Sequence, residues 1–250
     1  MTNEKINVEY YDLILKSNGR LGERRRNNML HNFKYVSKRS AKVRAAYNDL
    51  MVLLQEVRND LKEYTFQHKV VGSYSRDMMT YDEKSNVGFD FDVNIYPNFD
   101  KKGYTAKDIK LFFKKALDKH VKKHGFDYAE DSTRVLTIKV KDTRESRIIY
   151  SIDFAFVYDL DNNGKKCQLY IHYNKKQNTY ELKKQPSDYY ELAERVDWIK
   201  KNGLWDSELK PLYLKKKNEN SKQSVHSRQI FSMTVNEICM KYGFENNTIN

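Results

Sequence analysis

Two neighbouring stretches decide the fold: VVGSYS (residues 70–75) and FDFDVNIY (residues 89–96). The second alternates between apolar and polar residues with a period of two, which is typical of a half-buried β-strand. Its polar side carries Asp90 and Asp92, which lie roughly 6 to 7 Å apart along the strand. Like charges at this spacing raise each other's pKa unless a cation lies between them.

A divalent metal ion would remove this repulsion, because Mg²⁺ prefers carboxylate and phosphate oxygens. Two such ions can hold the attacking and the leaving oxygen of a nucleotidyl transfer. This kind of site usually needs a third acid on a neighbouring strand, and Asp153 qualifies because it interrupts the apolar run RIIYSIDFAFVY (residues 147–158). The alternative is that Asp90 and Asp92 simply form the solvated face of an edge strand. That alternative explains Asp153 less well, since an unpartnered buried carboxylate is costly.

The pair Gly72-Ser73 lies between a predicted strand and the acidic strand. A glycine at such a turn lets backbone N–H groups approach an anion, and the Ser73 hydroxyl can donate to a phosphate. A Gly-Ser pair alone is an ordinary turn, so only its position beside the acidic strand makes it a candidate phosphate site.

The periodicity along the rest of the chain predicts alternating helical and extended segments. We expect helices over residues 8–17, 40–64, 105–124, 187–202 and about 221–242, and strands over residues 68–72, 89–96, 134–141, 147–158 and 168–173. Pro97 should end the acidic strand, and residues 159–166 should form a turn. This order predicts an α/β (α+β) fold, a mixed sheet flanked by helices, with a core over residues 1–180 and a small helical lobe over residues 181–250.

The composition favours a polyanionic partner. The chain has 250 residues and a net charge of +12, with an arginine cluster at residues 24–26. RNA or DNA could bind such a surface, and so could nucleotides. The two cysteines have no CxxC spacing, which argues against a disulfide framework or a zinc site. No apolar run is long enough to span a membrane, so we expect a cytoplasmic protein without a membrane partner.

The combination of Gly72-Ser73, the Asp90-Phe91-Asp92 strand and Asp153 resembles the DNA polymerase β-like nucleotidyltransferase superfamily. The long helix before the Gly-Ser turn and the spacing to the third acid look most like one branch. That branch holds the oligoadenylate synthases, cyclic GMP–AMP synthase and the bacterial cyclic-oligonucleotide synthases. The resemblance covers residues 40–160 well and the remainder weakly.

The resemblance implies a two-lobed fold that binds a nucleoside triphosphate, such as ATP, and two Mg²⁺ ions, with Mn²⁺ as a substitute. Gly72 and Ser73 would bind the triphosphate, Asp90 and Asp92 would bind both metals, and Asp153 would hold the catalytic metal and help to deprotonate the acceptor hydroxyl. It also implies a role in antiviral defence. Further candidates are Arg76 and Thr80 for phosphate contact and, for stacking on a base, Tyr170, Tyr189, Tyr190 and Tyr213.

These residues predict a Mg²⁺-dependent enzyme that transfers an NMP unit from an NTP to a hydroxyl group. The acceptor would be another nucleotide, giving a cyclic or linear oligonucleotide messenger, or else an RNA end, a small molecule or a protein side chain. A different class of function is a non-catalytic, basic nucleic-acid-binding protein that keeps the fold. A metal-dependent nuclease ranks lower, because no acid–lysine pair of the usual nuclease pattern is present.

Overall fold

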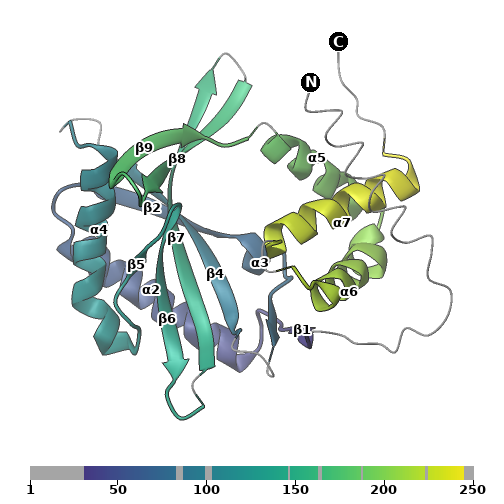
Figure 1. Ribbon diagram of the computed structural model, residues 1–250, viewed down its shortest axis with the longest axis horizontal. Helices are drawn as coiled ribbons and strands as arrows, with labels where there is room; N and C mark the ends of the chain where they lie inside the picture. The colour runs from purple at the N-terminus through teal and green to yellow at the C-terminus, as the bar shows by residue number, and fades with distance from the viewer. Residues whose placement is uncertain are drawn as a thin grey trace.

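A computed structural model of the chain describes residues 31–82, 87–98, 103–145, 147–162, 165–186, 188–222 and 225–244 (Figure 1). The helix predicted over residues 8–17 and the arginine cluster at residues 24–26 lie outside the described residues. None of the helices in the described ranges combines the length and the apolar composition that a membrane crossing requires.

The centre of the fold is a mixed sheet of seven strands. Its main path runs in the order β2 (Thr65–Val71), β4 (Phe89–Asn98), β7 (Arg147–Asn162), β6 (Val135–Asp142) and β5 (Glu130–Asp131), and β7 also pairs with β8 (Lys165–Asn174), which pairs with β9 (Thr179–Lys184). Strands β4 and β7 are parallel, whereas β2 and β6 pair with them in the antiparallel direction.

Helices α2 (Ala41–Asp60) and α4 (Ala106–His120) pack on the apolar face of this sheet. The apolar side of β4 lies against them, and Phe91 and Val93 are fully buried there. Thr105 caps the start of helix α4, because its Oγ1 accepts a hydrogen bond from the Asp108 N–H at 3.2 Å. The 3₁₀ turn that follows, Val121–His124, ends at Gly125 with φ of 76°. The predicted alternation of β4 and both long helices are thus confirmed.

The C-terminal part of the chain forms a second hydrophobic core. It consists of α5 (Asp188–Lys201), a π-helical turn (Trp205–Leu209), α6 (Lys210–Glu219) and α7 (Ser227–Tyr242). Figure 1 shows these helices gathered on one side of the molecule, with the large sheet, α2 and α4 on the other. The mixed sheet flanked by helices and the small helical lobe agree with the predicted fold class. The division of the chain near residue 180 stays a prediction.

The C-terminal helices differ from the sequence prediction. The helix predicted over about residues 221–242 is present but begins later, at Ser227, and residues 205–219 form helical segments that the sequence did not predict. Pro211 does not prevent α6, since it lies in the first turn, where its missing N–H is not needed. The lysine-rich sequence of α6 has little amphipathic character, which hid the helix.

Two predicted strand ends are also wrong. Pro97 lies within β4, because β4 pairs with β7 only as far as Ile95 and no hydrogen bond to β7 requires a donor at residue 97. The turn expected over residues 159–166 is mostly strand, since β7 continues to Asn162 and β8 begins at Lys165. Polar residues form strands here because β7 and β8 make a hairpin that extends beyond the large core.

The residues between the Gly-Ser turn and β4 contain a short strand that the sequence did not predict. Strand β3 (Thr80–Asp82) pairs with β1 (Phe33–Tyr35) in a separate two-stranded sheet. The buried Asn218 side chain of α6 holds this sheet. Its Oδ1 accepts from the Phe33 N–H at 2.6 Å and its Nδ2 donates to the Phe33 carbonyl at 3.2 Å. Asn218 therefore joins α6, from the C-terminal part of the chain, to β1, from the N-terminal part, near the Gly-Ser turn.

The substitution Asn218→Ala removes both hydrogen bonds and leaves two backbone groups of Phe33 without partners. We expect the free energy of unfolding to fall by about 1–3 kcal/mol, as for other buried groups that lose their partner. Urea denaturation measures this change. The control is Glu219→Ala at the exposed next position, and an equal loss in both variants would contradict the assigned role of Asn218.

Candidate active site

Strand register brings three acidic residues onto one face of the sheet. In the parallel pair of β4 and β7, Asp92 lies opposite Asp153, and Asp90 lies opposite Ser151. The residues on either side of each aspartate point into the core, so the three carboxylates share the face turned away from α2 and α4. On the next strand, Thr137 lies opposite Asp153, and its Oγ1 donates a hydrogen bond to Asp153 Oδ1 at 2.5 Å.

The Gly-Ser turn lies directly against these carboxylates. Val71, the last residue of β2, pairs with Asp92, so the chain enters the short helix α3 (Gly72–Ser75) beside that side chain. Gly72 has φ of +66°, and a Cβ at this position would lie 1.8 Å from Asp92 Oδ2. Both the backbone angle and the close approach therefore require glycine.

Ser73 has a side chain without a partner. Its Oγ is buried and makes no hydrogen bond to any described residue. A buried polar atom in this state is unusual, because nearly all such atoms are satisfied in folded proteins. An oxygen from a bound anion beside the turn would satisfy this hydroxyl.

The electrostatics of the three carboxylates reflect their crowding. Burial raises the pKa of Asp92 to about 7, the negative charges of Asp90 and Asp153 contribute to the rise, and Arg76 and Arg228 oppose it. Burial also raises the pKa values of the other two acids. Clustered carboxylates with raised pKa values are a common mark of functional sites, because such a cluster is costly unless a cation occupies it.

Several cations act on the acids, among them Lys139 on Asp153, and two of them come from the helical lobe. Lys217 of α6 and Arg76, at the end of α3, both lower the pKa of Asp90. Lys217 is held in place, since its Nζ donates to Thr80 Oγ1 at 2.6 Å and lies 4.3 Å from the centroid of the Phe33 ring. A further cation, Arg228 of α7, acts on Asp92. The helical lobe thus supplies positive charge to the acidic face of the sheet.

The sequence analysis missed Lys217 and Arg228. For Lys217 a signal did exist, because it lies four residues after the buried Tyr213 and so falls on the inward side of α6. The four-residue spacing indicates a shared side only if residues 210–219 form a helix, which the sequence did not predict. Arg228 begins a helix and has no comparable pattern.

The residues predicted to contact phosphate or to stack on a base already contact other protein groups where the structure describes them. Thr80 is buried and accepts the bond from Lys217, and the Arg76 guanidinium lies 4.4 Å from the centroid of the Phe231 ring. Two of the candidate stacking residues are buried: Tyr213 lies in the second core, and Tyr170 lies beneath the Arg134 guanidinium at 4.4 Å. The side chains at positions 189 and 190 lie outside the described part of the chain.

The carboxylates do not form a closed set of metal ligands. Within the described ranges, no three histidine, cysteine, aspartate or glutamate side chains come together closely enough to hold a metal ion. The chemistry of the site still fits a hard divalent cation, because three carboxylates share one face and their raised pKa values favour a neutralising partner. The roles of Gly72, Ser73 and the three aspartates stay predictions.

Solved structures with the same fold include bacterial cyclic dinucleotide synthases. Rhodothermus marinus CdnE, a c-UMP-AMP synthase solved with Apcpp and Upnpp, aligns with 80% of this chain and 72% of its own at 16% identity, with a TM-score of 0.51. Vibrio cholerae DncV, a cyclic AMP-GMP synthase in complex with nonhydrolyzable GTP, aligns with 76% of this chain but only 51% of its own, at 13% identity and a TM-score of 0.50.

No protein-family model matches the sequence, and no curated protein matches it either. The structural likeness therefore establishes the fold. The chain has the polymerase β-like nucleotidyltransferase fold, in the form that the bacterial cyclic dinucleotide synthases share.

The raised pKa of Asp92 predicts how stability depends on pH. Because this pKa lies above the ordinary value of 3.8, the folded protein binds a proton more tightly than the unfolded chain. Stability is therefore highest below the ordinary value and falls as the pH rises through 7. In EDTA, we expect Asp92→Asn to raise Tm at pH 8 by about 4 °C or more, the effect of roughly 1–2 kcal/mol in a domain of this size.

Differential scanning fluorimetry at pH 5 and pH 8 measures this effect, and the gain should be smaller at pH 5. The control is Asp197→Asn on the exposed side of α5, for which we expect no gain at either pH. An Asp92→Asn gain that is the same at both pH values would contradict the assignment.

Proposed function

We propose that this protein is a nucleotidyltransferase that transfers an NMP unit from an NTP to a hydroxyl group of a second nucleotide. One observation carries this proposal: Gly72 lies against Asp92, which lies opposite Asp153. A phosphate-binding turn and paired acids are thereby placed side by side. The shared fold supports the proposal, because CdnE and DncV are cyclic dinucleotide synthases solved with nucleotides or their analogues.

In this proposal, Asp90, Asp92 and Asp153 hold divalent metal ions, Mg²⁺ or Mn²⁺. Bound there, the metals would neutralise charge on the phosphates and lower the pKa of the acceptor hydroxyl. The chain itself contributes the alignment of the acids. Thr137 fixes the orientation of the Asp153 carboxylate, and strand pairing fixes its position relative to Asp92.

The triphosphate would bind between the two lobes. The unpartnered Ser73 hydroxyl would donate to a phosphate oxygen. Lys217 and Arg76 would contribute positive charge, which charge-assisted hydrogen bonds to phosphate require. Because Lys217 belongs to α6, a bound triphosphate would contact both the sheet and the helical lobe.

The reaction joins the acceptor oxygen to the α-phosphorus of the NTP and breaks the bond to the leaving pyrophosphate. The acceptor hydroxyl loses its proton in this step. By the resemblance to the nucleotidyltransferase superfamily, Asp153 would help to remove that proton. A second transfer from the first product would give a cyclic molecule, whereas release after one transfer would give a linear one.

Two parts of the proposal rest on the resemblance to bacterial synthases alone. These are ATP as the donor and a role in antiviral defence. Nucleic acid would bind through the basic surface that the net charge of +12 implies. Such a partner would act as an activator or as the acceptor.

Product analysis tests the proposed function. The purified chain is incubated with each labelled NTP and with all four, in Mg²⁺ or Mn²⁺, with and without RNA or DNA. We expect pyrophosphate and a phosphodiester-linked nucleotide product, and a loss of turnover on the order of 100-fold or more in Asp92→Asn. The exposed Asp197→Asn should keep full activity. Undiminished turnover in Asp92→Asn would overturn the mechanism.

Two glycine substitutions can distinguish the effect of the close contact between Gly72 and Asp92 from the effect of strain in the backbone at Gly72. We expect Gly72→Ala to lower kcat/KM by about 100-fold or more, because the new methyl group displaces Asp92 or the turn. The matched control is Gly103→Ala. Gly103 has a similar φ of +63°, but no atom lies within 4 Å of the place that its new methyl group would take.

Both glycine variants should lose stability because alanine is strained at either backbone angle, and Gly72→Ala should lose more because its methyl group also meets Asp92. Only Gly72→Ala should lose activity. Steady-state kinetics together with urea denaturation measure the two effects separately, and equal activity losses would show that strain, not contact with Asp92, limits the enzyme.

A further inference from the structure

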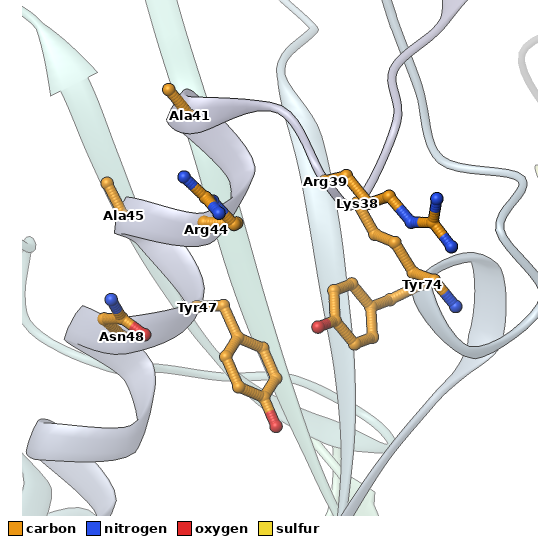
Figure 2. A pocket seen from close by; sticks show the side chains of 8 residues that line it. All are labelled: Lys38, Arg39, Ala41, Arg44, Ala45, Tyr47, Asn48 and Tyr74. Atoms are coloured by element: carbon orange, nitrogen blue, oxygen red, sulfur yellow. The ribbon is translucent and has the colours of Figure 1, made fainter.

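The chain that follows Ser73 is anchored in both hydrophobic cores. Tyr74 packs in the core of the large sheet, where its ring centroid lies 5.0 Å from that of Tyr47 and 5.3 Å from that of Phe91. Figure 2 shows the rings of Tyr74 and Tyr47 next to one another. Met78 is 2% exposed and belongs to the second core. Among the described residues, the other buried side chains of that core all come from α5, α6, α7 and the π-helical turn.

The residue after Met78 lies in the opposite core. Met79 is 1% exposed and packs in the core of the large sheet, and its carbonyl accepts a hydrogen bond from the Val36 N–H at 2.9 Å. Met78 and Met79 thus fill one core each. Withdrawal of either side chain would leave a cavity, which is costly, so this segment is held firmly at the place where the two cores approach one another.

Two backbone hydrogen bonds tie Met78 to the Gly-Ser turn. The Met78 N–H donates to the Ser73 carbonyl at 2.9 Å, and the Asp77 N–H donates to the Tyr74 carbonyl at 3.2 Å. This is the pairing of a Schellman motif, which ends a helix by turning the chain back onto its last carbonyls. Because α3 has only four residues, the motif closes on Ser73 itself. The position of the Ser73 backbone therefore depends directly on that of Met78.

The residue at the centre of this motif is strained. Asp77 has φ of +55°, in the left-handed region, where Schellman motifs usually have glycine because a Cβ is crowded there. The Asp77 side chain is exposed, so its own burial does not hold this conformation. The conformation is held instead by the residues on either side, Tyr74 in one core and Met78 in the other.

Two more contacts join this segment to the helical lobe. The Arg76 guanidinium lies 4.4 Å from the centroid of the Phe231 ring of α7. Thr80 Oγ1 accepts a hydrogen bond from Lys217 Nζ of α6 at 2.6 Å. Residues before and after Met78 thus contact the helical lobe, so the chain that leaves the Gly-Ser turn is fixed by that lobe as well as by the sheet.

We propose that Met78 is a positioning residue for the transfer reaction. Its side chain is seated in the second core and its N–H holds the Ser73 carbonyl, so the turn at Asp77 fixes where the Ser73 hydroxyl lies relative to Asp92. Met78 does not contact the substrate and acts through Ser73. This inference rests on the proposed function. It gives the helical lobe a second task besides the supply of positive charge, which is to keep the Gly-Ser turn in shape.

Hydrogen–deuterium exchange tests the structural link without substrate, metal or turnover. Met78→Ala should speed exchange of the backbone amides of residues 76–78 by about tenfold or more, because these amides make the hydrogen bonds that close the turn. The matched control is Ile238→Ala, which creates a cavity in the same core, about two helical turns along α7 from Phe231. It should leave these amides protected. Equally fast exchange in both variants would show general loosening of the lobe and overturn the role of Met78.

A double-mutant cycle with Ser73→Ala tests the consequence for catalysis. We expect Met78→Ala to lower kcat/KM by about tenfold or more when Ser73 is present. In the Ser73→Ala background the loss should be less than about twofold, because residues that act through one another are not additive. Met78→Leu, which conserves the volume, and Ile238→Ala should both keep the activity. Equal losses from Met78→Ala in both backgrounds would show that it acts elsewhere and would overturn the proposal.

A second pair of variants leaves both cores intact, so it decides the question even where Met78→Ala does not fold. Glycine suits the left-handed angle of residue 77, whereas a β-branched residue is strongly disfavoured there. We expect Asp77→Val to reproduce the faster exchange and the loss of activity, and Asp77→Gly to retain both protection and activity. If the two variants are equally active, the turn does not position Ser73 and the proposal is wrong.

Failure of the proposed function is recognised separately, because the unmodified protein would then release no pyrophosphate from any NTP. That result would overturn the role of Met78 in catalysis together with the proposed function. The exchange measurements would still decide whether Met78 holds the turn that contains Ser73.

Discussion

The parallel pairing of β4 with β7 is the constraint on which the acidic face of this protein depends. It places Asp92 opposite Asp153, and the antiparallel neighbours then add Gly72 from one side and Thr137 from the other. A slip of one residue in this pairing would turn a carboxylate toward the hydrophobic core under α2 and α4, at a prohibitive cost. The core that buries Phe91 therefore also aligns the acids, and the same contacts serve folding and the site.

The helical lobe supplies positive charge to the acidic face of the sheet. Burial raises the pKa values of all three acids and neighbouring carboxylates add to the rise at Asp92 and Asp153, so nearby positive charge favours the ionised cluster. Lys217 from α6 and Arg228 from α7 supply it, although both are more than a hundred residues away from β4 in the sequence. The tether between Asn218 and Phe33 lies one residue beyond Lys217, so the contact that joins the segments also holds this cation in position.

Local patterns predicted the sheet and the candidate acids, because strand alternation is visible within a few residues. The period of two in residues 89–96 identified one polar face, and Asp153 stood out as a lone charge in an apolar run. Lys217 could not be found in this way, since its position depends on a helix with little amphipathic character and on packing across the whole chain.

The cations opposite the acids have a consequence for the order of events in a transferase of this design. Before any substrate binds, Lys217 and Arg76 already offset the charge of Asp90. A bare triphosphate would compete for those same cations and leave the carboxylates uncompensated. A triphosphate that arrives as its magnesium complex brings part of the replacement positive charge with it, so the net charge between the lobes changes less. The protein would thus discriminate between free nucleotide and metal–nucleotide complex through charge balance alone, before any recognition of the base.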